Sequence, residues 1–297
     1  MRIVSLLPST TEILFALGAG DDVVGVTFEC DFPAEARTRR IVSTSAMPEG
    51  LPSAEIDAWV SAAMARGEDL YHLDEGALAG LDADLVVTQD LCAVCAVDTS
   101  VVDEALAHLG CRAEVLTIDP HTLEAVIGSV TTLGAATGTE GRAAEIVADL
   151  RNRLARVELA TRDLRRPRVA VLEWTDPPYA PGHWVPEMVE AAGGRSVLGT
   201  PGEKSVRVLP EQVLASAPDV VVCAPCGFDL DGATALAEQV VAAGWLPLGV
   251  EVWAVDANGS YARPGPRLVD GIESLAVALH PGLRDTVPDP APARRVR

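Results

Sequence analysis

Aromatic side chains are scarce in this chain, and basic side chains are outnumbered by acidic ones. Only 4% of the 297 residues are Phe, Trp or Tyr, and 23 Lys and Arg stand against 43 Asp and Glu. The formal net charge of −20 excludes the basic face that nucleic-acid binding needs, and it argues against docking on an anionic membrane. No run of about 20 apolar residues is present to span a bilayer.

The motifs of several common enzyme classes are missing too. The sequence has no glycine-rich phosphate loop of the Walker or Rossmann type, and no Ser-His-Asp order with a nucleophile elbow. The bulk composition, with 48% hydrophobic and 22% charged residues, is nevertheless that of a chain that buries a core. Its length suits one large domain or two of about 100–150 residues.

The N-terminus carries no pattern of a secretory leader. Met1 and Arg2 lead directly into an apolar run over residues 3–7, which is too short for a signal core and stops at Pro8. We therefore expect a cytoplasmic protein. In that compartment the six cysteines serve as free thiols, metal ligands or redox groups rather than as a disulfide frame.

Hydrophobic runs and helical periodicity alternate along both halves of the chain. Strands are predicted over residues 2–7, 23–27, 85–88, 113–118, 169–172, 220–223 and 252–255. Helices are predicted after most of them, including 101–109, 185–192, 231–243 and 268–279. Strands that alternate with helices indicate an α/β fold with parallel sheets.

The middle of the chain departs from this alternation. Residues 122–133 and 140–164 read as helices with no strand between them, and the second is long enough to join two lobes. We expect an N-terminal α/β lobe over 1–121, a helical connection over 122–166 and a C-terminal α/β lobe over 167–282. The proline-rich residues 283–297 are expected to be disordered.

This order resembles the class III periplasmic binding proteins, the cobalamin and ferric-siderophore receptors in which a helical backbone joins two Rossmann-like lobes. The resemblance covers about residues 1–282 and begins with Ser5-Leu6-Leu7-Pro8-Ser9-Thr10-Thr11-Glu12. A leaderless, cysteine-containing branch described as cobalamin-binding-like is the most similar. Its signatures are Glu29-Cys30-Asp31-Phe32-Pro33, Gln89-Asp90-Leu91-Cys92-Ala93-Val94-Cys95, Leu172-Glu173-Trp174, Gly182-His183-Trp184-Val185-Pro186 and Arg263-Pro264-Gly265-Pro266-Arg267.

Unusual polar and aromatic residues gather where the predicted strands end. Ligands bind outside the carboxyl ends of strands in open α/β sheets, so these residues are the candidates for a ligand cleft between the lobes. The candidate ligand-binding residues are Glu29, Gln89, Glu173, Trp174, Tyr179, His183, Trp184, Phe228, Tyr261 and Arg263. The aromatic ones offer flat surfaces to a planar ligand, while His72, His108, His121 and His280 are interpreted as non-functional.

Two Cys-x-x-Cys pairs also follow predicted strands, one in each half of the chain. The spacing is that of structural zinc and iron–sulfur sites, because two thiolates on one turn can reach the same ion. A redox-active disulfide and small residues that simply line the cleft are the alternatives. The candidate metal ligands are Cys30, Cys92, Cys95, Cys223, Cys226 and His183.

The resemblance implies a bilobal binding protein that holds a small-molecule ligand, cobalamin or a related corrinoid or another metal chelate. A cytoplasmic protein could not hand its ligand to an ABC permease, so we expect no such partner, and neither nucleic acid nor membrane insertion. The alternative function is a metal-dependent or thiol-based enzyme or metal-handling protein that uses zinc or iron held by the cysteines, with Glu29 and Glu173 as acid and base. A third hypothesis is a scaffold whose cleft binds a partner protein.

Overall fold

The computed structural model describes residues 1–297 except 49, 67, 69, 74–75, 90–112 and 288–290. The predicted helix over 101–109 lies outside the described residues. The chain divides into two compact units. Unit 1 comprises residues 1–120 and 128–147, and unit 2 comprises residues 121–127 and 148–297.

Unit 1 is built on a six-stranded sheet. The spatial order is β4 (Tyr71–Leu73), β3 (Arg40–Ser45), β2 (Val23–Thr27), β1 (Ile3–Ser5), β5 (Leu85–Thr88) and β6 (Glu114–Thr117). Every neighbouring pair is parallel except β3 and β4. Strands β1 and β5 are buried along their whole length, as expected for parallel strands covered on both faces.

The helices of unit 1 cover this sheet. They are α1 (Pro8–Ala16), the 3₁₀ turns η1 (Gly20–Asp22) and η2 (Ala34–Thr38), α2 (Ser53–Arg66) and parts of α4 (Leu123–Thr137) and α5 (Glu140–Thr161). Ile13 and Leu14 of α1 share a core cluster with Leu133 of α4 and Ala143 of α5. A Cβ on Gly134 would lie 2.5 Å from the Cβ of Ala143, so glycine permits the close approach of α4 and α5.

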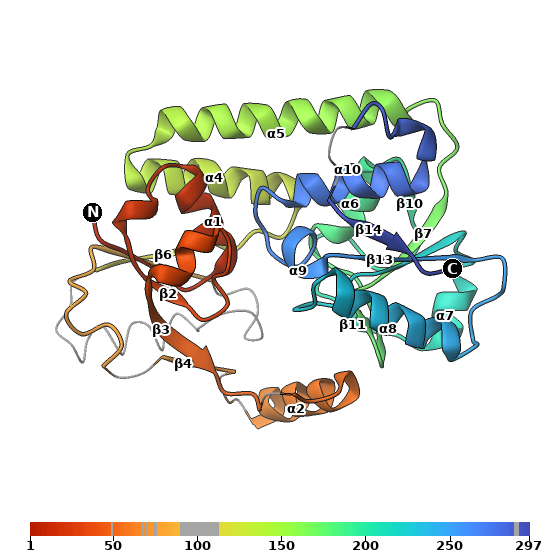
Figure 1. The fold of residues 1–297 in the computed structure, drawn as a ribbon, viewed down its shortest axis with the longest axis horizontal. Coiled ribbons are helices and arrows are strands. Elements are labelled where there is room, and N and C mark those ends of the chain that lie inside the picture. The colour runs from red at the N-terminus through yellow and green to blue at the C-terminus, as the bar shows by residue number, and fades with distance from the viewer. Residues whose placement is uncertain (49, 67, 69, 74–75, 90–112, 288–290) are drawn as a thin grey trace. The chain divides into compact units, whose positions relative to one another are not determined.

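Unit 2 contains a five-stranded sheet and a small three-stranded sheet (Figure 1). The order in the large sheet is β10 (Arg195–Ser196), β7 (Arg168–Leu172), β12 (Val220–Cys223), β13 (Glu251–Val255) and β14 (Ala293–Arg295). Strands β7, β12 and β13 are parallel neighbours. The small sheet joins β8 (Trp174–Thr175), β9 (Pro178–Ala180) and β11 (Val206–Arg207) in antiparallel fashion.

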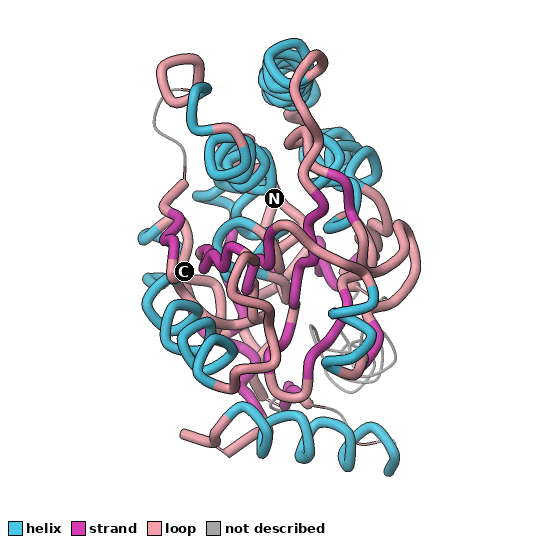
Figure 2. Tube along the Cα trace, turned by 90° about the vertical axis from the view of Figure 1, so that its right-hand side faces the viewer, coloured by secondary structure: helices cyan, strands magenta, loops and turns pink. Residues whose placement is uncertain are grey.

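The helices of unit 2 lie on both faces of its large sheet. Figure 1 shows α6 (Val185–Ala191) and α10 (Leu268–Leu279) on one side and α7 (Pro210–Ala215) and α8 (Leu230–Ala242) on the other. The turns α9 (Ala257–Ser260) and η3 (Pro281–Leu283) complete the unit. Figure 2 colours the trace by secondary structure and shows helices and strands along it. Parallel strands with helices on both faces of the sheet confirm the predicted α/β class. None of the described helices combines the length and the apolar character that crossing a bilayer requires.

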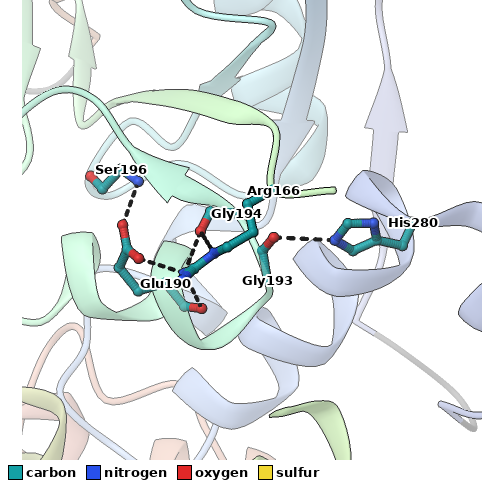
Figure 3. A network of polar contacts seen from close by, with 6 residues as sticks. All are labelled: Arg166, Glu190, Gly193, Gly194, Ser196 and His280. Atoms are coloured by element: carbon teal, nitrogen blue, oxygen red, sulfur yellow. Dashed lines mark hydrogen bonds and ion pairs between the residues drawn. The ribbon is translucent and has the colours of Figure 1, made fainter. Parts of the chain in front are cut away.

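A network of polar contacts closes the C-terminal end of α6 (Figure 3). The helix gives way to Gly193, whose φ of +79° is the left-handed conformation typical of a helix end. The guanidinium of Arg166 donates to the carbonyl oxygens of Glu190 and Gly194, and His280 Nε2 lies 3.3 Å from the Gly193 carbonyl oxygen. The last carbonyl groups of α6 are thereby satisfied.

The end of the chain differs from the expectation. Residues 283–297 were expected to be disordered, but β14 pairs antiparallel with β13. Arg295 forms an ion pair with Glu251, Arg294 with Asp231, and the Arg297 side chain donates to the carbonyl oxygens of Val250 and Pro247. The prolines predicted a disordered tail. The three arginines that follow them instead bind acidic side chains and carbonyl oxygens of unit 2.

The long helix expected in the middle of the chain is present as α5, and a charge cluster fixes it to α10. The Arg153 guanidinium binds Glu273 and Asp270, with Arg153 Nε 3.1 Å from Glu273 Oε1. The Glu273 side chain is only 7% exposed. The hydrogen bonds to Glu273 and Asp270 raise the pKa of Arg153 against the opposing effect of burial.

Arg153→Met is expected to lower the free energy of unfolding by about 3 kcal/mol, because Glu273 would keep a buried carboxylate without its main partner. Urea denaturation followed by circular dichroism measures this. Arg151→Met is the matched control: Arg151 pairs with Glu124, both are well exposed, and its loss should cost about 0–1 kcal/mol. The double variant Arg153→Met/Glu273→Met should recover much of the stability, and equal effects of the two single variants would contradict this account.

Candidate functional site

The loops at the carboxyl edge of the large sheet of unit 2 are joined by main-chain hydrogen bonds. After β12, Ala224 N donates to Leu172 O over 2.9 Å and Cys226 N donates to Glu173 O over 3.1 Å. After β13, Asn258 N donates to Phe228 O over 3.0 Å. The loops that follow β7, β12 and β13 therefore form one connected layer, as the prediction of a site at strand ends requires.

Two half-exposed aromatic rings lie in this layer, Trp174 and Phe228, which we call the aromatic pair. Their ring centroids are 5.7 Å apart and their planes are inclined by 59°, within the range of favourable edge-to-face contacts. The indole Nε1 of Trp174 donates to Asp176 O over 3.0 Å. A Cβ on Gly232 would lie 2.8 Å from Phe228 Cδ1, so α8 begins directly against the Phe228 ring.

Glu173 and Tyr179 lie beside the aromatic pair on the small sheet. Tyr179 faces Trp174 across the β8–β9 ladder, and Glu173 N donates to Tyr179 O over 3.1 Å. The Glu173 carboxylate accepts a hydrogen bond from Ser205 Oγ. The exposed Arg207 places its guanidinium carbon 5.9 Å from the centre of the Tyr179 ring, a cation–π distance.

Trp184 and Tyr261, which the sequence predicts as ligand contacts, are both buried in unit 2. Trp184 is 6% exposed, and its Nε1 donates to Tyr261 O over 2.8 Å. Tyr261 is 2% exposed, and its burial raises the pKa of the phenol. Arg263, two residues further on, is also buried at 8%. Both rings belong to the packing that supports the loops, because each joins segments far apart in the sequence.

His183 occupies an unusual backbone position. Its φ of 49° is left-handed, which is uncommon for a non-glycine residue. His183 N donates to Glu203 O over 2.7 Å, and Gly202 N donates to His183 O over 2.9 Å. The His183 ring centroid lies 5.6 Å from that of Trp184 and 5.9 Å from that of His121. The sequence analysis interpreted His121 as non-functional, because nothing in the sequence links two histidines 62 positions apart.

The described candidates in unit 1 lie just after strands β2 and β5. Glu29 Oε2 accepts a hydrogen bond from Tyr71 OH over 3.0 Å, and the exposed Phe28 ring lies 6.1 Å from the Tyr71 ring. Gln89, directly after β5, is buried at 4%. Cys30 is 2% exposed within the core, with its sulfur 3.1 Å from Thr11 Oγ1. The structure thus brings Glu29 next to an aromatic surface that the sequence did not identify.

The cysteines do not form the predicted metal centre in the part of the chain that the structure describes. Cys223 is fully buried in the core of unit 2, and this burial raises the pKa of its thiol to about 12. Cys226 is exposed on the following turn. Cys92 and Cys95 lie outside the described residues, and no group of three His, Cys, Asp or Glu among the described ones could hold a metal.

The family model described as periplasmic binding protein matches residues 3–243. The chain belongs to this family. A curated protein of Halobacterium salinarum named cobalamin-binding protein is 27% identical over 288 residues, which cover 94% of this chain and 69% of the relative. The Bacillus subtilis protein YvrC is an uncharacterized ABC transporter substrate-binding lipoprotein. It is 25% identical over 291 residues, which cover 94% of this chain and 80% of the relative.

Solved structures of the family share the fold. The periplasmic heme-binding protein RhuT from Roseiflexus sp. RS-1 matches with a TM-score of 0.68 and 21% identity, over 95% of this chain and 99% of that chain. The periplasmic vitamin B12 binding protein BtuF of Vibrio cholerae matches with a TM-score of 0.62 and 21% identity, over 95% and 98%. These likenesses confirm the predicted class III architecture.

The two described cysteines of the second Cys-x-x-Cys pair should differ strongly in reactivity. With a pKa of about 12, only on the order of one Cys223 thiol in 10⁴ is ionised near pH 7.5. We expect iodoacetamide to modify Cys226 at least tenfold faster than Cys223 in the folded, reduced protein, as measured by peptide mass spectrometry over time. In denaturant the two rates should converge. Equal rates in the folded protein would refute the buried position of Cys223.

Proposed function

We propose that the protein binds a flat metal chelate of the corrinoid or heme class, and that the aromatic pair contacts it. The observation that carries the proposal is the position of Trp174 and Phe228. Both rings are half-exposed and lie at the carboxyl edge of a parallel sheet in a member of a binding-protein family. This edge is where open α/β sheets bind ligands.

The surface formed by the aromatic pair and its neighbours suits a ligand with a planar, largely uncharged face. Aromatic residues make up only 4% of the chain, so two rings in contact at a strand edge form a concentrated apolar surface. The neighbouring Glu173 carboxylate is hydrogen-bonded to Ser205 and Arg207 lies over Tyr179. A macrocycle could pack on the rings while its polar substituents reach these groups.

The comparisons support the same ligand class. One relative is named a cobalamin-binding protein, and structures with the same fold are named for heme or vitamin B12. These names support a binding protein that takes up its metal already chelated.

The location of the protein and the fate of its ligand stay predictions. One similar protein is an ABC transporter substrate-binding lipoprotein, whereas our prediction is a cytoplasmic protein without a permease partner. Fractionation of cells that produce the native gene product separates the two: recovery with the cytosol supports the prediction, and recovery with the envelope refutes it.

Ligand titration tests the proposed function. Aquocobalamin and hemin are added separately to the purified chain, and binding is followed by absorption spectra and calorimetry. Trp174→Leu and Phe228→Leu should each weaken binding about 5- to 30-fold, which corresponds to about 1–2 kcal/mol for the loss of one aromatic contact.

Trp245→Leu is the matched control. Trp245 follows the far end of α8 from Phe228, and a 13-residue helix separates them by about 20 Å. Its substitution should leave ligand affinity within twofold of the unsubstituted chain, with thermal unfolding as the check on folding. No binding of either chelate, or unchanged affinity in both Trp174→Leu and Phe228→Leu, would overturn the proposal.

A further inference from the structure

We propose that His121 and His183 form a binding site for a divalent late transition-metal ion, such as Ni²⁺, Cu²⁺ or Zn²⁺, in unit 2. The two residues are called the imidazole pair below. The site is separate from the aromatic pair and does not depend on the proposed chelate ligand, because it would hold an uncomplexed ion.

The spacing of the imidazole pair suits one shared ion. Metal–nitrogen bonds of about 2.0–2.1 Å place each ring centroid about 3.2 Å from the ion, so two rings on one ion lie about 5.2 Å apart at a tetrahedral angle and about 6.4 Å apart when opposite. The observed centroid separation is 5.9 Å, with the ring planes inclined by 47°. The observed separation lies between these two values and is therefore compatible with one shared ion.

The backbone holds both histidines in place. His183 has a left-handed φ, which costs roughly 1 kcal/mol or more for a non-glycine residue and is maintained by its hydrogen bonds to Glu203 and Gly202. A Cβ on Gly182 would lie 2.2 Å from Glu203 O, so the two loops are in direct contact. Strain that is retained at a potential ligand is typical of functional positions.

His121 is fixed from the other side by α6. Leu123 N donates to Glu187 Oε2 over 2.6 Å, which ties the segment after His121 to the helix that begins just after His183. Fixed ligands lose little conformational entropy when they bind an ion.

The ligand set indicates the type of ion. Neutral imidazole nitrogen suits nickel, copper and zinc, whereas calcium and magnesium prefer oxygen. No third His, Cys, Asp or Glu joins these histidines within the described ranges. Two protein ligands leave coordination positions for water or for a donor atom of a small molecule.

Titration with Ni²⁺ tests the site, because thiols do not reduce this ion as they reduce Cu²⁺. The full chain carrying Cys226→Ser is titrated with NiCl₂ in a non-coordinating buffer, by calorimetry and by tryptophan fluorescence. We expect one ion per chain and quenching of Trp184, whose ring lies 5.6 Å from His183. His121→Gln and His183→Asn should each weaken binding at least tenfold; asparagine is chosen because it tolerates the left-handed backbone.

Two histidines elsewhere serve as matched controls. His72 is exposed on β4 of unit 1, and His280 contacts Gly193 in the network of Figure 3. His72→Gln and His280→Gln should bind Ni²⁺ as the parent chain does. Wild-type binding in either His121→Gln or His183→Asn, or equal losses in the control variants, would overturn the site.

A measurement on the unsubstituted histidines covers the case in which a variant fails to fold. Diethyl pyrocarbonate modifies imidazoles, and peptide mass spectrometry gives its rate at each histidine with and without Ni²⁺. Slower modification of His121 and His183 together, with no change at His72, supports the site. Protection of only one of the two, or of neither, refutes it. Failure of chelate binding would leave these results unaffected, so the two proposals can fail separately.

Discussion

The parallel register of β7, β12 and β13 is the constraint on which the proposed ligand surface depends. Leu172, Cys223 and Ala254 are neighbours across this sheet, so three strands end at one edge. Backbone groups beyond the edge have lost their ladder partners, and an unpaired buried group is costly. They pair with one another instead, through Ala224, Cys226 and Asn258. These main-chain hydrogen bonds hold residues some 50 positions apart in one layer, without any contribution from side chains.

The same strand end separates the environments of the two cysteines in the second Cys-x-x-Cys pair. Cys223 is the last residue of β12 and its side chain joins the core beneath α8, whereas Cys226 lies on the exposed turn beyond the sheet. Here the boundary between strand and turn falls between them. Sequence spacing alone cannot show where that boundary lies.

The sequence predicted those parts of the fold that depend on long apolar runs. Strands β1, β2, β5, β7, β12 and β13 and the helices α5, α8 and α10 were expected at nearly their observed positions. Strand β3 was missed because Ile41 and Val42 are its only large apolar residues. Strands β8 and β9 were missed because they are short and separated by Asp176-Pro177. Pairing with neighbouring strands, rather than their own composition, makes these segments strands, as is common in β-sheets.

Side-chain exposure was predicted less well than position. Glu173, Trp174 and Phe228 lie at the strand edge as expected, but Trp184 and Tyr261 turn inward, because Trp184 Nε1 and the Tyr261 carbonyl form a buried hydrogen bond. A tryptophan after a glycine and a histidine reads the same in a sequence whether its ring faces a ligand or the core. The orientation of the Trp184 ring depends on its hydrogen bond to Tyr261, which is 77 positions away. No local sequence pattern reveals such a partner.

That buried hydrogen bond also connects the two surfaces of unit 2. Trp184 follows His183 directly and binds Tyr261, Tyr261 N donates to Ala257 O, and Asn258 N donates to Phe228 O. The short helix α9 therefore links the loop that carries the imidazole pair to the loop that carries the aromatic pair. Because each link is a hydrogen bond between closely packed segments rather than a flexible connection, the two pairs hold a fixed relative position within the unit. A chelate on the aromatic pair and an ion on the imidazole pair would then meet a preorganised surface, which lowers the entropic cost of binding either one.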